Sequence, residues 1–189
     1  MTIVTREEKL RNVMWVIMAV YMLALLRFTL FKYVPLTRLP DAFFLREREY
    51  NVIPFKAIYE IIKELPTLRM IENIAGNIIL FIPFGLIFPL ASVFEGETPV
   101  YGFITSLLIE VAQYGFAMGA ADIDDIILNV IGVLIGYKIL YRMIILRIFK
   151  ERDTMLTVMA LLLGIGLTAG LFVLYYAGYL VNGFPNVTS

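Results

Sequence analysis

The fold is decided by a stretch of 22 uncharged residues, NIAGNIILFIPFGLIFPLASVF, which occupies Asn73–Phe94. A helix needs about 20 mostly apolar residues to cross the roughly 30 Å hydrocarbon core of a membrane, and this stretch has that length. Pro83 and Pro89 are tolerated in such a helix when neighbouring helices satisfy the freed carbonyl groups, and they predict a kink. The stretch therefore predicts a membrane-spanning helix.

The composition of the whole chain agrees with a bilayer as its solvent. Of the 189 residues, 60% are hydrophobic and 17% are charged, whereas soluble domains are about 45–50% apolar and about 25% charged. Sixteen basic residues balance sixteen acidic ones, which argues against a nucleic-acid partner. The chain has no Cys and no His, which excludes disulfides, thiolate nucleophiles, imidazole bases and the usual zinc or haem ligands.

Four further segments have the length and apolarity of membrane spans. The sequence therefore predicts an all-α integral membrane protein with five transmembrane helices in a single membrane domain, 1–189. The last segment is 28 residues long without a charge, so that it must tilt, bend or project from the bilayer. The four segments are Val13–Phe31, Thr98–Ala121, Ile126–Tyr137 with the preceding Asp122–Asp125 cluster, and Thr154–Val181.

The long connection between the first two spans, 32–72, carries an amphipathic pattern. After Asn51 and Pro54, apolar residues recur at helical spacing, and charged residues occupy another face. Pro66 ends the pattern. We expect a short interfacial helix that lies along the membrane surface. Its apolar positions are Phe55, Ile58, Tyr59, Ile61, Ile62 and Leu65, and its charged positions are Lys56, Glu60, Lys63 and Glu64.

The distribution of Lys and Arg predicts the orientation in the membrane. Three aspartates begin the fourth span, and five basic residues lie at and beyond its end, in Lys138–Arg152. Basic residues near the ends of spans favour the cytoplasmic side. The amino terminus is then cytoplasmic, and the carboxyl terminus and the long connection are external.

Polar residues inside the spans predict a site in the external half of the bundle. Glu110 lies roughly 9 Å below the end of its helix, and Asn129 lies roughly 10 Å below Asp122 on the antiparallel helix, so that the two can meet. An ionisable group near mid-span is costly, which makes function or a buried ion pair the default interpretation of Glu110. The residues expected to converge are Arg27, Asn73, Asn77, Glu110, Gln113, Asp122, Asp125 and Asn129.

Several of these residues also have a purely structural interpretation. Asp122 is a candidate helix cap, although three acids in four residues exceed what one cap needs. Asn77 and Asn129 are candidates for hydrogen bonds that join helices. Small residues four positions apart predict close helix packing at Gly115 and Gly119, at Gly132 and Gly136, and at Gly166 and Gly170.

Four blocks of residues follow one another in a distinctive order: Asn51-Val-Ile-Pro-Phe55, Asn73-Ile-Ala-Gly-Asn-Ile-Ile-Leu-Phe-Ile-Pro-Phe-Gly85, Glu110-Val-Ala-Gln113 and Asp122-Ile-Asp-Asp-Ile-Ile-Leu-Asn-Val-Ile-Gly132. Together they resemble the VanZ-like family, whose members are bacterial membrane proteins. The resemblance covers a core of about 51–136, and the helix at about 154–181 is an extra carboxyl-terminal span. The family is named for a teicoplanin-resistance factor that accompanies glycopeptide-resistance genes without remodelling the D-Ala-D-Ala terminus.

The resemblance implies a multi-pass protein of the bacterial cytoplasmic membrane that lowers susceptibility to teicoplanin and other lipophilic glycopeptides. It would do so by altering the outer membrane surface or by binding the drug. Its partners would be membrane lipids, with a lipid-linked cell-wall precursor or a lipoglycopeptide as the ligand. The substrate-binding candidates are Asn77, Gln113, Asn129, Asn73 and Arg27.

Two other functions stay open at this point. The first is an intramembrane enzyme that acts on lipid-linked phosphate or glycolipid head groups, with Glu110, Asp125 and Asp122 as catalytic candidates. In that case Asp122, Asp125 and Asn129, which share one helix face, would hold a divalent cation, Mg²⁺ or Ca²⁺, or Glu110 would act as general acid or base. The second is a lipid or proton-coupled transporter, for which a five-span chain without a repeat is a poor fit.

Overall fold

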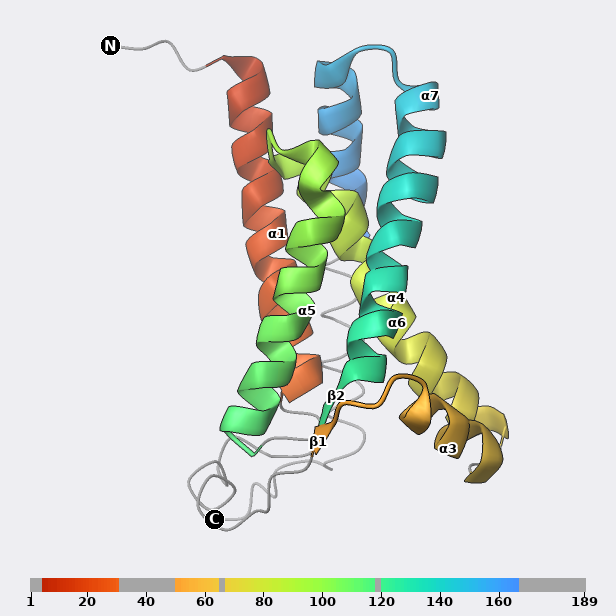
Figure 1. Cartoon of the computed structure of the whole chain (residues 1–189). Coiled ribbons are helices and arrows are strands. Elements are labelled where there is room, and N and C mark those ends of the chain that lie inside the picture. Colours follow the sequence, from red (N-terminus) through yellow and green to blue (C-terminus); the bar gives the residue numbers. More distant parts are fainter. Residues whose placement is uncertain (1–4, 31–49, 65–66, 118–119, 167–189) are drawn as a thin grey trace, which may run out of the picture.

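The computed structural model describes residues 5–30, 50–64, 67–117 and 120–166, which form a bundle of helices with a short helix and a pair of strands at one end (Figure 1). The π-helix η3 continues α6, and the 3₁₀ turn η2 joins α4 to α5. A further helix spans 152–166. The long elements are α1 (Arg6–Leu30), α4 (Thr67–Ala91), α5 (Thr98–Gly115), α6 (Ile123–Leu134) and η3 (Ile135–Ile145); the short ones are β1 (Tyr50–Asn51), α3 (Lys56–Glu64), η2 (Glu95–Glu97), β2 (Ala121–Asp122) and α7 (Leu146–Ile148).

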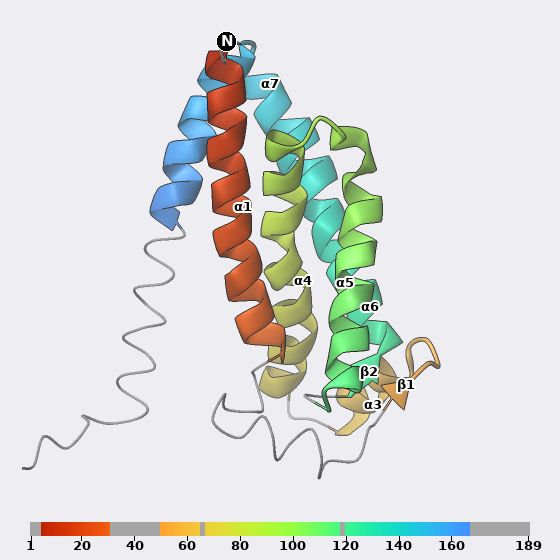
Figure 2. The same ribbon diagram turned by 90° about the vertical axis from the view of Figure 1, so that its left-hand side faces the viewer.

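Helix α4, which contains the decisive stretch, lies at the centre of the bundle. It contacts α1, α5, α6 and η3, and Figure 2 shows it side by side with α1 and α5. Both Pro83 and Pro89 lie inside the helix, as the sequence predicts. The central position explains why this segment lacks charges, because its neighbours cover it on several sides.

Within the described residues, two helices are long and apolar enough to cross a membrane, Arg6–Leu30 and Asn73–Ala91. The expected third span is helical only as far as Gly115, over the 18 residues of α5, and α6 with η3 covers the expected fourth span. The expected fifth span, Thr154–Val181, lies partly outside the described residues. The count of five spans therefore stays a prediction.

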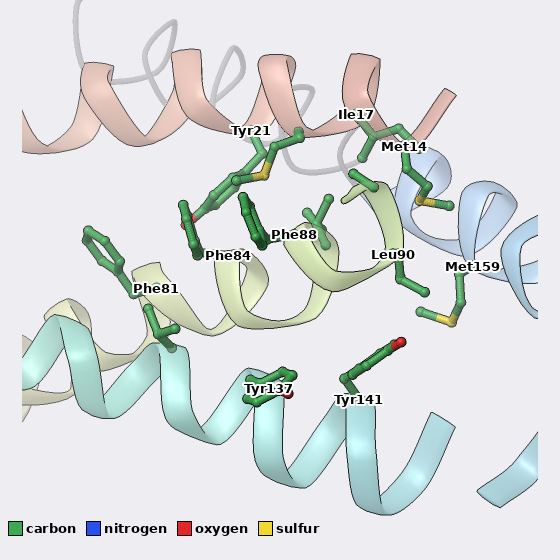
Figure 3. Packing of buried hydrophobic residues seen from close by; sticks show 14 of the residues in the cluster. Met14, Ile17, Tyr21, Phe81, Phe84, Phe88, Leu90, Tyr137, Tyr141 and Met159 are labelled. Carbon is green, nitrogen blue, oxygen red and sulfur yellow. The ribbon is translucent and has the colours of Figure 1, made fainter. Parts of the chain in front are cut away.

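Aromatic rings fill the interface between α1 and α4. Tyr21 reaches across from α1 and donates its hydroxyl proton to the carbonyl oxygen of Leu80 at 2.7 Å. The rings of Phe84 and Phe88 stack beside it, with their centroids 5.5 Å apart (Figure 3). On the opposite side of α4, Tyr137 lies on the facing helix and is buried in the same core. This core holds α4 between α1 and η3.

Glycines bring the backbone of α4 into direct contact with those of α6 and η3. A methyl group added to Gly132 would lie 2.2 Å from the carbonyl oxygen of Ile78, and one added to Gly136 would lie 2.1 Å from that of Ile82. The close packing predicted for this pair of glycines is therefore confirmed. A methyl group on Gly115 or on Gly166 would meet nothing within 4 Å, and their partners, Gly119 and Gly170, lie outside the described residues.

The third predicted span ends earlier than expected, and strands appear in an otherwise helical chain. Helix α5 stops at Gly115, and Ala117 adopts a left-handed conformation with φ of 52°, which cannot continue a helix. The chain then forms β2, which pairs in parallel with β1 so that Asn51 lies opposite Asp122. The predicted end at Ala121 is wrong because this residue belongs to the strand pair.

The outer face of α5 is apolar, and its inner face is polar. Thr98, Ser106 and Glu110 are buried on the inner side. The exposed large side chains of this helix are Val100, Phe103, Ile104, Leu107, Leu108, Val111 and Tyr114. A helix of a soluble protein shows the opposite distribution, since polar groups there face water. This arrangement suits a hydrocarbon solvent around the bundle.

Candidate functional site

A cavity of about 390 Å³ lies at the end of the bundle where α1 and α5 end and α4 and α6 begin (Figure 1). We call it the polar cavity because carboxylates and amides from α4, α5 and α6 line it, together with Arg27 and Thr29 from α1. Its lining residues are Arg27, Phe28, Thr29, Asn73, Gly76, Asn77, Leu80, Ile109, Glu110, Gln113, Asp125 and Asn129.

The polar cavity brings together seven of the eight residues that the sequence places at a common depth. The exception is Asp122, which lies outside this cavity at the first residue before α6. The seven are Arg27, Asn73, Asn77, Glu110, Gln113, Asp125 and Asn129. Their assembly supports the comparison of helix depths, and the roles assigned to them stay predictions.

Glu110 is the buried carboxylate in the wall of this cavity, with 5% of its surface exposed. Its Oε2 atom accepts a hydrogen bond from the backbone N–H of Asp122 at 2.9 Å. The interaction ties the end of α5 to the start of α6. Glu110 thus has a structural partner, and its carboxylate also faces the cavity.

Three amide side chains of the cavity are oriented by the protein. Asn77 donates from Nδ2 to Oδ1 of Asp125, and Asn129 donates from Nδ2 to the hydroxyl of Ser106 at 2.9 Å. Gln113 donates from Nε2 to the carbonyl oxygen of Thr29 at 3.2 Å. These bonds cross between helices, as predicted for Asn77 and Asn129, so that the same residues join the bundle and line the cavity.

One cavity atom lacks a partner within the part of the chain that the structure describes. The Oε1 atom of Gln113 is buried and accepts no hydrogen bond there. A buried acceptor left unsatisfied costs about 1–3 kcal/mol. A ligand with a hydroxyl or N–H group would remove this cost once the Gln113 side chain turned Oε1 toward the cavity.

Asp122 and Asp124 hold the surrounding frame in place. Asp122 caps α6 by accepting from the N–H of Asp124 at 2.9 Å, which confirms the cap interpretation, and its Oδ1 also accepts from Nδ2 of Asn51 at 2.9 Å. Asp124 is 1% exposed and accepts from the N–H groups of Phe55 and Ile58, the latter at 3.1 Å. It thereby caps the amino-terminal end of α3 from a distant part of the chain.

Sequence reasoning did not select Asp124 as a residue with a role of its own. The available signal was the third acid in four residues, more than one helix cap requires. The second cap serves another helix, and nothing local in the sequence shows which one. The contact joins residues 66 and 69 positions apart.

The proposed metal ligands do not all lie together. Asp125 and Asn129 line the polar cavity, whereas Asp122 directs its carboxylate to Asn51 and to the backbone of α6. Among the described residues, no group of three or more His, Cys, Asp or Glu side chains is placed to hold a metal ion. The divalent cation stays a prediction from the sequence.

A second hollow, of about 460 Å³, adjoins the polar cavity on the other side of Glu110. We call it the apolar groove, because most of its wall is hydrocarbon. Tyr50 and Tyr114 meet edge to face in its wall, with their ring centroids 6.0 Å apart. The residues that line it are Tyr50, Asn51, Val52, Leu107, Glu110, Val111, Tyr114, Ala121, Asp122, Ile123 and Ile126.

The described chain is mostly helical, and two of its helices are candidate membrane spans. The sequence profile of the VanZ/LLP1 family matches residues 18–150, a range that contains every residue of the polar cavity, and the chain belongs to this family. Protein VanZ of Enterococcus faecium is 31% identical over 125 residues, which cover 65% of this chain and 70% of that protein. No solved structure matches. The predicted VanZ-like resemblance is confirmed.

Proposed function

We propose that this chain is a multi-pass protein of the bacterial cytoplasmic membrane whose polar cavity binds the head group of an amphiphile at the external leaflet. Through this binding it lowers susceptibility to teicoplanin and other lipophilic glycopeptides, either by holding the drug or by altering the lipid surface that the drug enters. The proposal joins the family membership to the position and chemistry of the cavity.

The membrane topology rests on the distribution of polar and apolar surface. The exposed side of α5 is hydrocarbon, and its buried side carries Ser106 and Glu110. Five exposed basic side chains lie along η3 and beyond it: Lys138, Arg142, Arg147, Lys150 and Arg152. The chain there runs toward α7, at the end of the bundle away from the cavity (Figure 1). Basic residues favour the cytoplasmic side, so that the cavity would face the external leaflet.

The observation that carries the proposal is the polar cavity itself. Polar and ionisable groups inside a membrane bundle are costly, and their usual reason is a ligand or an ion path. Here hydrogen bonds between helices already orient Asn77, Gln113 and Asn129. Side chains fixed before binding lose little conformational freedom when a ligand arrives, which favours affinity. The oriented amides therefore support ligand binding as the function of the polar cavity.

Asn73 offers a clean test, because it lines the cavity with a partly buried side chain. We expect Asn73→Leu to restore teicoplanin susceptibility in a Gram-positive host that expresses the chain. The matched control is Leu108→Ala, on the exposed apolar face of α5, which should keep the protective effect. The assay is the minimal inhibitory concentration of teicoplanin, compared with that of a glycopeptide without an acyl chain.

The amount of each variant in the membrane fraction is measured alongside. Equal protection by wild type and Asn73→Leu at equal protein levels would contradict the proposal. Equal protection against both glycopeptides would contradict the preference for lipophilic drugs.

A further inference from the structure

The polar cavity and the apolar groove share one side chain, Glu110. Its carboxylate accepts from the N–H of Asp122, which lines the groove. This hydrogen bond forms the partition between the two hollows. The site therefore has a polar half and an apolar half in immediate contact, which matches the two halves of an amphiphile.

We propose that the apolar groove holds the acyl chain of the same molecule whose head group occupies the polar cavity, and that this molecule is an acylated glycan. The inference rests on the proposed function and adds the chemical class of the ligand. A membrane glycolipid and an acylated glycopeptide share this chemistry.

The lining of the polar cavity calls for a head group that donates hydrogen bonds. The carboxyl oxygens of Glu110 and Asp125 line the cavity as hydrogen-bond acceptors, and Oε1 of Gln113 is a buried acceptor without a partner among the described residues. Sugar hydroxyls supply donors without adding charge. One cation, Arg27, and two carboxyl groups, those of Glu110 and Asp125, line the cavity, so that a neutral head group brings no further charge into a medium of low dielectric.

The apolar groove suits an acyl chain that enters from the bilayer. Leu107 and Val111 line it and are also exposed on the outer face of α5, so that hydrocarbon of the membrane reaches the groove directly. An acyl chain can enter sideways without passing through water. Its head group then lies against Glu110, at the boundary with the polar cavity.

The experiment uses the full chain in phosphatidylcholine nanodiscs and two photoreactive probes. One is dodecyl glucoside with a diazirine in its alkyl chain, and the other has the same chain on a phosphocholine head. After irradiation, peptide mapping locates the labelled residues. We expect the glucoside to label groove residues, such as Val111 and Ile126, several-fold more than the phosphocholine probe does.

Two tryptophan variants on one helix provide the control. Val111→Trp fills the groove and should remove the excess labelling by the glucoside, whereas Leu108→Trp, equally exposed but outside the groove, should keep it. Equal labelling of the groove by both probes would overturn the inference, because it would show ordinary boundary lipid.

The failure of this inference differs from the failure of the proposed function. If labelling by the glucoside depends on Asn73 but maps to the end of α1 near Phe28, the alkyl chain of the probe lies outside the groove. Binding of the head group in the polar cavity would still hold. Both the inference and the proposed function would be contradicted if the glucoside labelled no site more than the phosphocholine probe does and if Asn73→Leu left the labelling unchanged. Competition by unlabelled teicoplanin or by a bacterial glycolipid extract then distinguishes the two sources of the acylated glycan.

Discussion

Replacing Gly132 by alanine tests the helix contact that forms one wall of the site. The added methyl group would lie 2.2 Å from the carbonyl oxygen of Ile78, whereas an ordinary contact begins at 3.4 Å. The backbones of α4 and α6 must therefore separate by about 1.2 Å, and overpacking of this kind costs about 1–3 kcal/mol. The better helix propensity of alanine offsets about 1 kcal/mol of this cost. We expect a net loss of stability of up to about 2 kcal/mol.

Gly115→Ala is the matched control, since its methyl group would meet nothing within 4 Å. We expect this variant to be as stable as the wild type or slightly more stable. Both variants would be unfolded by heat in the same detergent, with the helical circular dichroism signal as the readout. A loss of about 1 kcal/mol lowers the midpoint by about 2–4 °C in a chain of this size. Equal midpoints for the two variants would refute the reasoning about close packing.

Three further substitutions have defined outcomes. Asp124→Ala removes the cap on α3. We expect hydrogen exchange at the N–H groups of Phe55 and Ile58 to become at least about tenfold faster, because the lost cap lowers the local free energy of opening by about 1.4 kcal/mol. Unchanged exchange at these groups would contradict the capping role. Tyr21→Phe deletes the hydroxyl that bonds to α4 and should cost about 1 kcal/mol in thermal unfolding, and no change would show that bond to be negligible. Glu7→Gln breaks a half-exposed ion pair and should change stability by less than about 1 kcal/mol, an effect that added salt removes; a larger, salt-independent loss would show a different role.

The polar cavity was predictable because few positions in an apolar span carry a polar side chain. The constant rise of a helix converts the positions of Glu110 and Asn129 into depths, and antiparallel neighbours then place them together. The same reasoning identified Asn77 and Gln113, which line the cavity. Close packing at Gly132 was also visible, because small residues four positions apart have few other uses in a membrane helix.

The frame around the cavity was not predictable from local patterns. The pairing of Asn51 with Asp122 and the capping of α3 by Asp124 join segments far apart in the sequence, and neither leaves a periodic signal. The end of α5 also escaped prediction, since Ala117 is a residue that normally continues a helix and here has a positive φ. Tertiary contacts override local propensity at these points.

The most direct test of the account is an experimental structure of the full chain extracted with its native lipids. The account predicts density for a polar head group in the cavity, with a hydroxyl or N–H donor within hydrogen-bond distance of Oε1 of Gln113 and contacts to Asn73. A cavity in which these side chains close on one another, with Gln113 satisfied by a protein donor and no room for a head group, would contradict it.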